Sequence, residues 1–329
     1  MLKEALQRFF ENHSALSEKK TFAIAVSGGS DSMALAHALL SSHPDQTFHI
    51  LSVNHGLRAE AEAEIEKVKQ WSAAFLNAEF YGLKWQGEKP ESRIMEAARN
   101  ARYALMAEHC YQHDIEVLFV GHHQDDQAET ILTRIAKGSG LDGLAGMSDL
   151  SDYDENLELA RPFLSLPKTD LINYCENYKL PIVLDPSNEN RDYLRPRLRE
   201  IKALLEEEGL SSKRLSKLAE RMKRSKKALE WLSQQAFDES LLQQDRDHIT
   251  FKASALMAYP DDIGLRALRE ALSSFHEDQM YGLRFEKVED LHTALVEAYE
   301  SNENMKQRSL GHCFIAYKVK TDEIIIKTA

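Results

Sequence analysis

The first two thirds of the chain alternate between short apolar runs and longer amphipathic stretches, and this alternation limits the fold more than any other feature. The apolar runs cover residues 21–26, 47–53, 79–84 and 116–121. The stretches between and after them predict helices that begin near residue 30 and cover 59–77, 91–112 and about 125–137. Parallel strands need crossover connections, and helices usually supply them. The pattern therefore predicts an α/β fold with an open, parallel, Rossmann-like sheet and helices on both faces.

Length and a change of pattern divide the chain into two predicted domains. At 329 residues it exceeds the usual size of a single core. Three more elements complete the first domain: a strand at 158–163, a helix that starts after Pro167, and an extended segment that ends at Asp185-Pro186. A Gly-, Ser- and Asp-rich stretch at 138–156 predicts a mobile loop. We expect a catalytic domain over 1–208 and a mainly helical domain over 209–329, which ends in a β-hairpin at 311–328.

Composition restricts the partners and the compartment. The chain has 41 basic and 53 acidic residues, a net charge of -12, so a polyanion would have to meet a local basic patch. The cysteines Cys110, Cys175 and Cys313 form no C-x-x-C pair, which predicts a reducing, cytoplasmic setting. No apolar run approaches the roughly 20 residues of a membrane span, and the amino terminus lacks a signal-peptide core. We expect a soluble protein.

The loop that joins the first strand to the first helix of the sheet predicts a phosphate site. It reads Ser27-Gly28-Gly29-Ser30-Asp31-Ser32. The glycines let the backbone approach a phosphate, and the free N–H groups of the next helix supply donors. The three serines add hydroxyl donors, whereas Asp31 can face phosphate oxygens only through a cation, which implies Mg²⁺. The alternative is a plain turn in which Ser30 or Asp31 caps the helix.

The loop fits neither the Walker pattern nor the dinucleotide fingerprint, but it resembles the PP-loop of the N-type ATP pyrophosphatases. Four further segments extend the resemblance to the tRNA(Ile)-lysidine synthetase family. They are Val53–Arg58, Glu96–Tyr103, 121–147, and Arg161-Pro162 together with 181–199. The chain departs from the family at Lys137, where arginine is common, and it is similar in length to the shorter members.

The resemblance implies a reaction and three catalytic candidates. ATP adenylates the C2 oxygen of the wobble cytidine in a tRNA(Ile) with the anticodon CAU, and free L-lysine then displaces AMP. Asp31 would hold the Mg²⁺ at the pyrophosphate, and Asp126 would orient or deprotonate the reacting groups. Arg102 would contact an ATP phosphate or the cytidine, unless it forms a structural salt bridge with Glu96 or Asp126.

Other residues at the same edge of the predicted sheet have simpler interpretations. Asn54 and His55 follow the second strand and are expected to border the ATP. His122 and His123 could suggest a transition-metal pair, but neighbouring side chains point to different sides of a backbone, and Asp125 as a helix cap is the simpler account. Glu129 and Thr130, one turn further, are expected to face the site or lock the helix.

A basic patch hidden by the overall acidity predicts where tRNA binds. Residues 211–227 hold eight cations against one acid, Glu220. On a helix the apolar side chains of this stretch share one face and the cations cover the other. The predicted tRNA contacts are Lys213, Lys217, Arg221 and Arg224, together with Arg195 and Arg197 upstream. The alternative is an ordinary solvated helix face.

Three rival functions remain open at this point. A tRNA thiolase of the same superfamily needs a reactive cysteine or a cluster, which the spacing of the three cysteines does not suggest. A small-molecule amidating enzyme such as an NAD or GMP synthetase would have no use for the basic patch. An RNA-binding protein that holds ATP without ligase activity is the third rival. Assembly as a homodimer is also left open.

Overall fold

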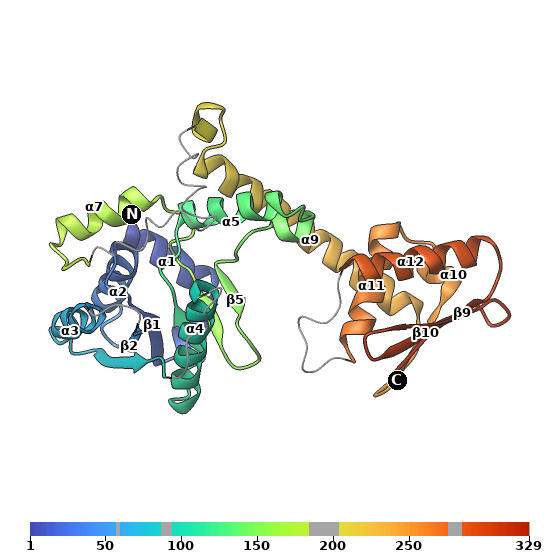
Figure 1. Cartoon of the computed structure of the whole chain (residues 1–329), viewed down its shortest axis with the longest axis horizontal. Helices are drawn as coiled ribbons and strands as arrows, with labels where there is room; N and C mark the ends of the chain where they lie inside the picture. The colour runs from blue at the N-terminus through green and yellow to red at the C-terminus, as the bar shows by residue number, and fades with distance from the viewer. Residues whose placement is uncertain (57–59, 87–93, 184–203, 276–284, 329) are drawn as a thin grey trace. The chain divides into compact units, whose positions relative to one another are not determined.

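The computed structural model describes residues 1–56, 60–86, 94–183, 204–275 and 285–328 (Figure 1). By internal contacts the chain divides into two compact units, Met1–Lys223 and Arg224–Ala329. The first unit therefore extends to Lys223. The catalytic domain was expected to end at residue 208, and that boundary stays a prediction. No helix in the described ranges is long and apolar enough to cross a membrane.

The first unit is built on a six-stranded sheet with the order β3-β2-β1-β4-β6-β5. The strands are β1 Thr21–Ala25, β2 Thr47–Asn54, β3 Ala78–Lys84, β4 Val117–Phe119, β5 Leu150–Asp152 and β6 Glu158–Ala160. Neighbours pair in parallel, except that β5 runs antiparallel to β6. The open parallel sheet predicted from the apolar runs is confirmed, with one antiparallel edge strand added.

Helices cover both faces of this sheet. They are α1 Leu2–Asn12, the short 3-10 helix η1 Ser14–Glu18, α2 Ser30–Ser42, α3 Ala61–Ser72, α4 Ile94–Gln112, α5 Gln124–Ala136, α6 Leu141–Leu144 and α7 Lys168–Asn177. Successive side chains of a strand point to opposite faces. Phe22 and Ile24 of β1 therefore join a core cluster with α1, α2 and α7, whereas Ala23 joins a second cluster with α4. Both faces are buried, as parallel sheets require.

The stretch 138–156, predicted as one mobile loop, is not irregular throughout, because it contains α6 Leu141–Leu144 and β5 Leu150–Asp152. Two side chains of α5 hold it in place. Arg134 donates from Nη1 to the carbonyl oxygens of Gly143 and Gly146, at 2.5 and 3.0 Å. The Gln127 amide both donates to and accepts from the backbone of Met147. A Gly-rich composition predicted irregular backbone here but could not show these anchors.

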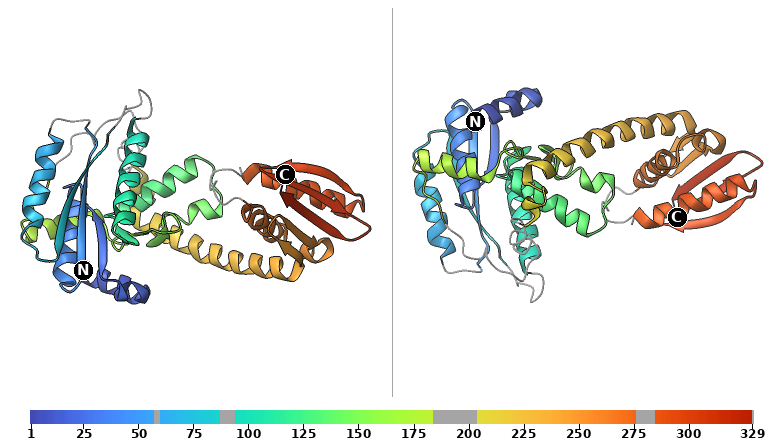
Figure 2. Two further views of the ribbon diagram at one scale, coloured as in Figure 1. Left: turned by 90° about the horizontal axis from the view of Figure 1, so that it is seen from below. Right: turned by 90° about the horizontal axis from the view of Figure 1, so that it is seen from above.

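The second unit combines helices with an antiparallel sheet (Figure 2). After α9 Ser212–Ser240, which begins in the first unit, it contains α10 Ala253–Leu256, α11 Asp261–Ser273 and α12 Phe285–Glu300. Its strands are β7 Leu241–Asp245, β8 His248–Lys252, β9 Met305–Leu310, β10 Cys313–Lys318 and β11 Glu323–Thr328. The expected terminal hairpin is β10 and β11, but they form the middle of a five-stranded sheet, β7-β8-β11-β10-β9. Alternate residues of β10 and β11 are buried against α11 and α12.

Candidate active site

The loop between β1 and α2 has the backbone of a phosphate-binding turn. Gly28 has φ +87°, and a Cβ there would lie 3.0 Å from Val183 Cγ2, so a side chain would be both strained and crowded. The buried Ser32 hydroxyl donates to the Gly29 carbonyl oxygen at 3.0 Å and accepts from the Ser27 N–H at 3.2 Å. Ser32 thus fixes the shape of the loop. The N-terminus of α2, at Ser30, supplies unbonded N–H groups beside it.

The residues after β4 lie against this loop. β1 and β4 are neighbours in the sheet, but the strand after β1 lies on one side of this pair and the strand after β4 lies on the other. Open parallel sheets bind ligands beyond the carboxyl ends of two strands where the strand order reverses in this way. Gly121 permits the close approach, because a Cβ at this position would lie 2.9 Å from the carbonyl carbon of Asp31. The predicted loop and the segment from Gly121 onward therefore form one edge site.

Three ionisable side chains gather around the imidazole of His123, which is 2% exposed. His123 Nε2 lies 3.5 Å from Asp31 Oδ2 and 3.3 Å from Asp126 Oδ2. Lys168 Nζ lies 3.6 Å from the same oxygen of Asp31. Asp31 and Asp126 were predicted as catalytic residues, and the structure brings them to one imidazole. His123 and Lys168 were not predicted as members of this group.

The charges in this group stabilise one another. Burial alone would raise the pKa of Asp31, but His123 and Lys168 outweigh it, so this pKa is lowered and the carboxylate is ionised at neutral pH. Burial alone would lower the pKa of His123, but the carboxylates of Asp31 and Asp126 outweigh it and raise this pKa. His123 Nδ1 accepts the N–H of Asp125 at 3.2 Å, so in this arrangement the ring proton is on Nε2, facing the two carboxylates.

The oxygens of the group suit a hard cation. Mg²⁺ is bound through one or two carboxylates together with substrate phosphates. Asp31 is ionised, 29% exposed, and lies at the phosphate-binding loop, and Asp126 faces the same nitrogen of His123. The donor set therefore fits the Mg²⁺ expected at Asp31. A transition-metal pair at His122 and His123 does not fit as well, because the His123 ring is engaged by Asp31, Asp125 and Asp126.

The expected cap at Asp125 is wrong, because His123 is the N-cap of α5. The His123 ring accepts the N–H of Asp125, and Asp126 Oδ2 accepts the N–H of His123 in return, which forms a capping box. Asp125 instead accepts from the Ser212 hydroxyl at 2.8 Å and from the Lys168 N–H at 3.1 Å. It therefore fastens the first turns of α7 and α9 to α5. The Thr130 hydroxyl donates to the Asp126 carbonyl oxygen. Of the two roles expected for Thr130, facing the site or locking the helix, this contact supports the second.

A cavity of about 570 Å³ opens beside this group. His123, Asp125, Glu129 and Lys168 supply its polar wall. Leucines and an isoleucine from α5, α7, α9 and the residues just before α9 supply the apolar wall, namely Leu132, Ile172, Leu205, Leu210 and Leu215. The size is that of a site for a small organic ligand, such as a nucleoside or an amino acid.

Asn54 and His55 lie at the same edge of the sheet, at the end of β2. The Asn54 side chain accepts the N–H of Gly56 at 2.7 Å and shapes this turn. The His55 ring lies 6.4 Å from the ring of Trp85, edge to face. The part of the expected motif at 57–58 lies outside the described residues. Contact of these residues with ATP stays a prediction.

Arg102 belongs to a second group on α4. Its guanidinium carbon lies 5.5 Å from the centre of the Tyr103 ring, and that of Arg99 lies 5.3 Å from it. Tyr103 in turn stacks on Tyr153, which precedes β6. The structure thus places Arg102 beside an aromatic pair, and its contact with ATP or cytidine stays a prediction.

Cys175 lies closer to the phosphate-binding loop than its place in the sequence suggested. Its thiol donates to the Ser30 carbonyl oxygen, at 3.2 Å. The side chain is 1% exposed, and burial raises its pKa to about 11. Cys110 and Cys313 are also buried. A thiol in this state is a poor nucleophile, so its position does not supply thiolation chemistry.

The predicted basic stretch forms the first half of α9. Lys213, Lys217, Arg221 and Arg224 are exposed, whereas Leu215 and Ala219 are buried against α5. The amphipathic pattern is therefore confirmed, and tRNA binding by these four residues stays a prediction. Arg195 and Arg197, the other two predicted contacts, lie outside the described residues.

Asp149 joins α9 to α1 and predicts a pH-dependent stability. It accepts from Lys223 Nζ at 2.7 Å and from His13 Nε2 at 3.0 Å. Burial would raise its pKa, but these partners lower it to about 2. Asp149→Asn should lower the free energy of unfolding by about 1 kcal/mol at pH 7, since Asp149 is partly exposed.

This difference between wild type and Asp149→Asn should shrink as the pH falls from about 4 toward 2. A carboxyl group with a lowered folded pKa stabilises above its unfolded pKa, near 3.9, and this contribution is lost as the pH falls through the folded value. Urea unfolding at several pH values measures it. Asp152→Asn, at an exposed position of β5, is the control. A difference that is constant with pH would contradict the assignment.

Comparison with known proteins agrees with this geometry. Residues 1–205 match a family model described as a PP-loop domain. The tRNA(Ile)-lysidine synthase of Methylobacterium nodulans is 37% identical over 269 residues, which are 82% of this chain and 79% of that protein. The protein of the same name from Bradyrhizobium diazoefficiens is 36% identical over 309 residues, covering 90% of this chain and 82% of the other.

A solved structure is similar in fold. The U34-tRNA thiolase NcsA from Methanococcus maripaludis, with its 4Fe-4S cluster, aligns with a TM-score of 0.57 and 17% identity. The alignment covers 68% of this chain and 79% of that one. At this identity the likeness supports a shared fold and nothing about the reaction.

Proposed function

Because the chain belongs to the PP-loop family and, within it, to the tRNA(Ile)-lysidine synthases, we propose that it joins free L-lysine to the wobble cytidine of a tRNA(Ile) with the anticodon CAU at the expense of ATP. The observation that carries the proposal is the group formed by Asp31, His123, Asp126 and Lys168 at the phosphate-binding loop. The product is lysidine, which pairs with A rather than G and so changes the codon from AUG to AUA.

The reaction has two steps. In the first, the cytidine O2 forms a bond to the α-phosphorus of ATP, the bond from that phosphorus to the bridging oxygen breaks, and pyrophosphate leaves. In the second, the lysine nitrogen forms a bond to C2, the C2–O bond breaks, and AMP leaves with the oxygen. The amine gives up a proton in this step. The protein must therefore orient two pairs of reactants, stabilise the leaving phosphates and accept a proton.

The loop residues supply the stabilisation of the leaving pyrophosphate. α2 begins at this edge, where its N-terminal N–H groups and dipole favour negative charge, and the hydroxyls of Ser27 and Ser30 would add donors to the phosphates. Lys168 adds a positive charge beside Asp31. A Mg²⁺ ion held by Asp31 would neutralise phosphate charge when bound. Asn54 and His55 would border the nucleotide from the end of β2.

Asp126 and His123 supply the proton chemistry in this proposal. Asp126 is an ionisable carboxyl group beside the cavity-lining His123, and 19% of its side chain is exposed. It can orient the amine or accept its proton. His123 holds Asp31 and Asp126 in place through one nitrogen while its other nitrogen caps α5. Arg102 is assigned to the phosphate or the cytidine by family resemblance.

The tRNA would bind along the basic face of α9. Lys213, Lys217 and Arg221 are exposed on the same helix whose start Asp125 fastens to α5. Arg224 of α9 and, outside the described residues, Arg195 and Arg197 are proposed as further tRNA contacts. Free lysine as the second substrate and a cytoplasmic setting belong to this proposal, and a homodimer stays an open prediction.

Incorporation of labelled lysine tests the proposal. The purified chain is incubated with ATP, Mg²⁺, labelled lysine and unmodified tRNA(Ile) bearing CAU, and label in the tRNA is counted together with released pyrophosphate. We expect one lysine per tRNA, and none when the wobble cytidine is replaced by uridine. Label from sulfide in place of lysine would support a thiolase, and ATP binding without either label would support an RNA-binding protein.

A further inference from the structure

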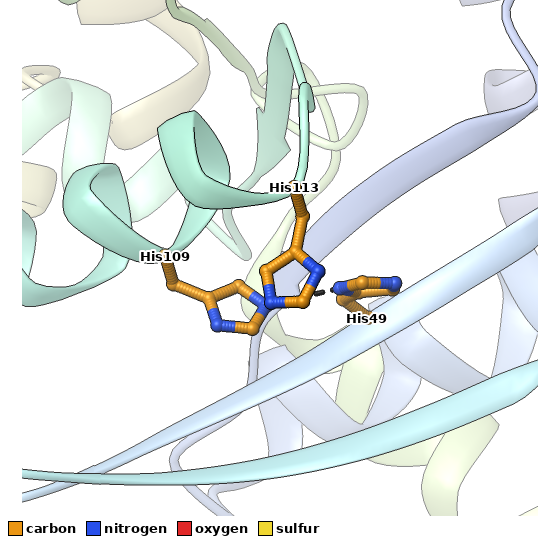
Figure 3. A group of neighbouring side chains, drawn as sticks. All are labelled: His49, His109 and His113. Atoms are coloured by element: carbon orange, nitrogen blue, oxygen red, sulfur yellow. Dashed lines mark hydrogen bonds between the residues drawn. The ribbon is translucent and has the colours of Figure 1, made fainter.

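Three histidines lie together on the first unit (Figure 3). His49 is the third residue of β2, His109 is in the last turn of α4, and His113 follows the end of that helix. β2 continues from His49 to Asn54 at the edge of the nucleotide site. At about 3.3 Å per residue, the histidines lie roughly 16 Å from that edge along the strand. The proposed ligation reaction makes no use of them.

The spacing of the ring nitrogens suits a single metal ion. His49 Nδ1 and His109 Nε2 are 2.9 Å apart, and one nitrogen from each of the three rings lies within 4.8 Å of the others. A tetrahedral zinc ion with bonds of about 2.0–2.1 Å separates its nitrogen ligands by about 3.4 Å. The separation between His49 and His109 is about half an ångström shorter than this value, and all three nitrogens lie within 4.8 Å of one another. Small rotations of three side chains, one of them exposed, would therefore complete the geometry.

The Glu79 carboxylate lies beside the second ring nitrogen of His49. His49 Nε2 lies 3.6 Å from Glu79 Oε2, so the two nitrogens of His49 face different partners, His109 and Glu79. The Tyr81 hydroxyl donates to the same Glu79 oxygen at 2.8 Å, and its ring stacks on His49. Metal-binding histidines usually place their second nitrogen against a carboxylate in this way, which leaves the first nitrogen free for the ion.

The cluster is also accessible from the surface of the first unit. His49 and His109 are 5% and 6% exposed, whereas His113 is on the surface and Glu79 is more than half exposed. His49 Nδ1 and His109 Nε2 are within hydrogen-bond distance of each other, so a bound metal ion would replace this hydrogen bond.

We propose that His49, His109 and His113 bind one divalent transition-metal ion of the zinc class, with Glu79 as the carboxylate behind His49 and a water molecule completing the coordination. Imidazole ligands select zinc, copper or nickel over magnesium. The ion would tie the last turn of α4 to β2. It would therefore stabilise the helix that carries Arg102 without entering the reaction.

Metal binding by the full chain tests this inference without measuring activity. Tag-free protein is treated with a chelator, and Zn²⁺ affinity is measured by competition with a chromophoric chelator. Co²⁺ serves as a spectroscopic probe of the ligands. We expect one equivalent of Zn²⁺, and Co²⁺ absorption bands of a four- or five-coordinate site that Zn²⁺ displaces. Absence of stoichiometric binding, or Co²⁺ with the spectrum of the free aqua ion, would overturn the proposal.

Two variants and a control locate the ion. His113→Ala removes an exposed ligand and should weaken Zn²⁺ binding at least tenfold and remove the Co²⁺ bands, while Glu79→Gln should weaken binding about tenfold and keep the stoichiometry. His312→Ala, on an exposed turn of the second unit, should bind as wild type does. Zn²⁺ should also raise the unfolding temperature of wild type but not of His113→Ala. Equal binding by wild type and His113→Ala would place the ion elsewhere.

Discussion

Asp31→Asn should reduce lysine incorporation into tRNA(Ile) by about 10³-fold while the chain remains folded. The substitution preserves the shape of the side chain but removes its charge, and with it the proposed contact to Mg²⁺ and the pairing to His123 and Lys168. Removal of one charge-stabilising group from an active site typically lowers turnover by about 10²–10³-fold. Pyrophosphate release and lysine incorporation should fall together, because adenylation precedes ligation.

The control for Asp31→Asn is Asp45→Asn, which removes an exposed carboxylate between α2 and β2. Circular dichroism and the unfolding temperature of both variants show whether the fold is intact. Raising the Mg²⁺ concentration should restore part of the activity of Asp31→Asn if metal binding is what was lost. Turnover of a folded Asp31→Asn within tenfold of wild type would remove Asp31 from the catalytic group.

Reversing two charges on α9, in the variant Lys217→Glu/Arg221→Glu, should weaken tRNA binding by about 10- to 100-fold at low salt. The two side chains are exposed and one helical turn apart. Each phosphate contact contributes about 0.7–0.9 to the slope of log affinity against log salt concentration, so losing two should lower the slope by about 1.5. ATP affinity should not change.

The matched control on the second unit is Lys306→Glu/Arg308→Glu, which reverses two exposed cations on β9. Filter binding or fluorescence anisotropy over a range of salt concentrations measures all three proteins. A salt slope for Lys217→Glu/Arg221→Glu equal to that of wild type would mean that this face of α9 is an ordinary solvated surface. An equal loss in the control would indicate a general charge effect rather than a binding face.

The sequence was most informative where a local pattern determines structure. The central strands are buried on both faces, so they appear as continuous apolar runs, and β1, β2 and β4 were predicted within a few residues. β7, β8 and β9 were missed. Most residues of β7 and β9 are exposed, which leaves no buried alternation to detect, whereas β8 is mainly buried but only five residues long. β5 has three residues and forms only through pairing with β6.

The sequence predicted those site residues whose position follows from neighbouring residues in the chain, but not the contacts between residues far apart in the sequence. Ser27–Ser32 and Asp126 follow strand ends, so their edge of the sheet could be inferred. Asp125 was misassigned as a cap because its actual partner, Ser212, is 87 residues away. The contact of Cys175 with Ser30 spans 145 residues and has no local signal. His109 and His113 are four residues apart, at the end of α4 and just after it, but His49 completes their cluster from β2, which has no local signal for it.

The segment from Gly121 to Gln127 restricts how this protein can change. Gly121 admits the first turn of α2, His123 caps α5 and lies beside Asp31, Gln124 donates to the Ser165 and Leu166 carbonyls, Asp125 holds α7 and α9, and Gln127 anchors Met147. Five of seven consecutive positions thus make contacts with segments distant in the sequence. A substitution that improved one of these contacts would disturb another, so divergence in substrate preference should accumulate outside this segment, in the walls of the cavity and on the surface of α9.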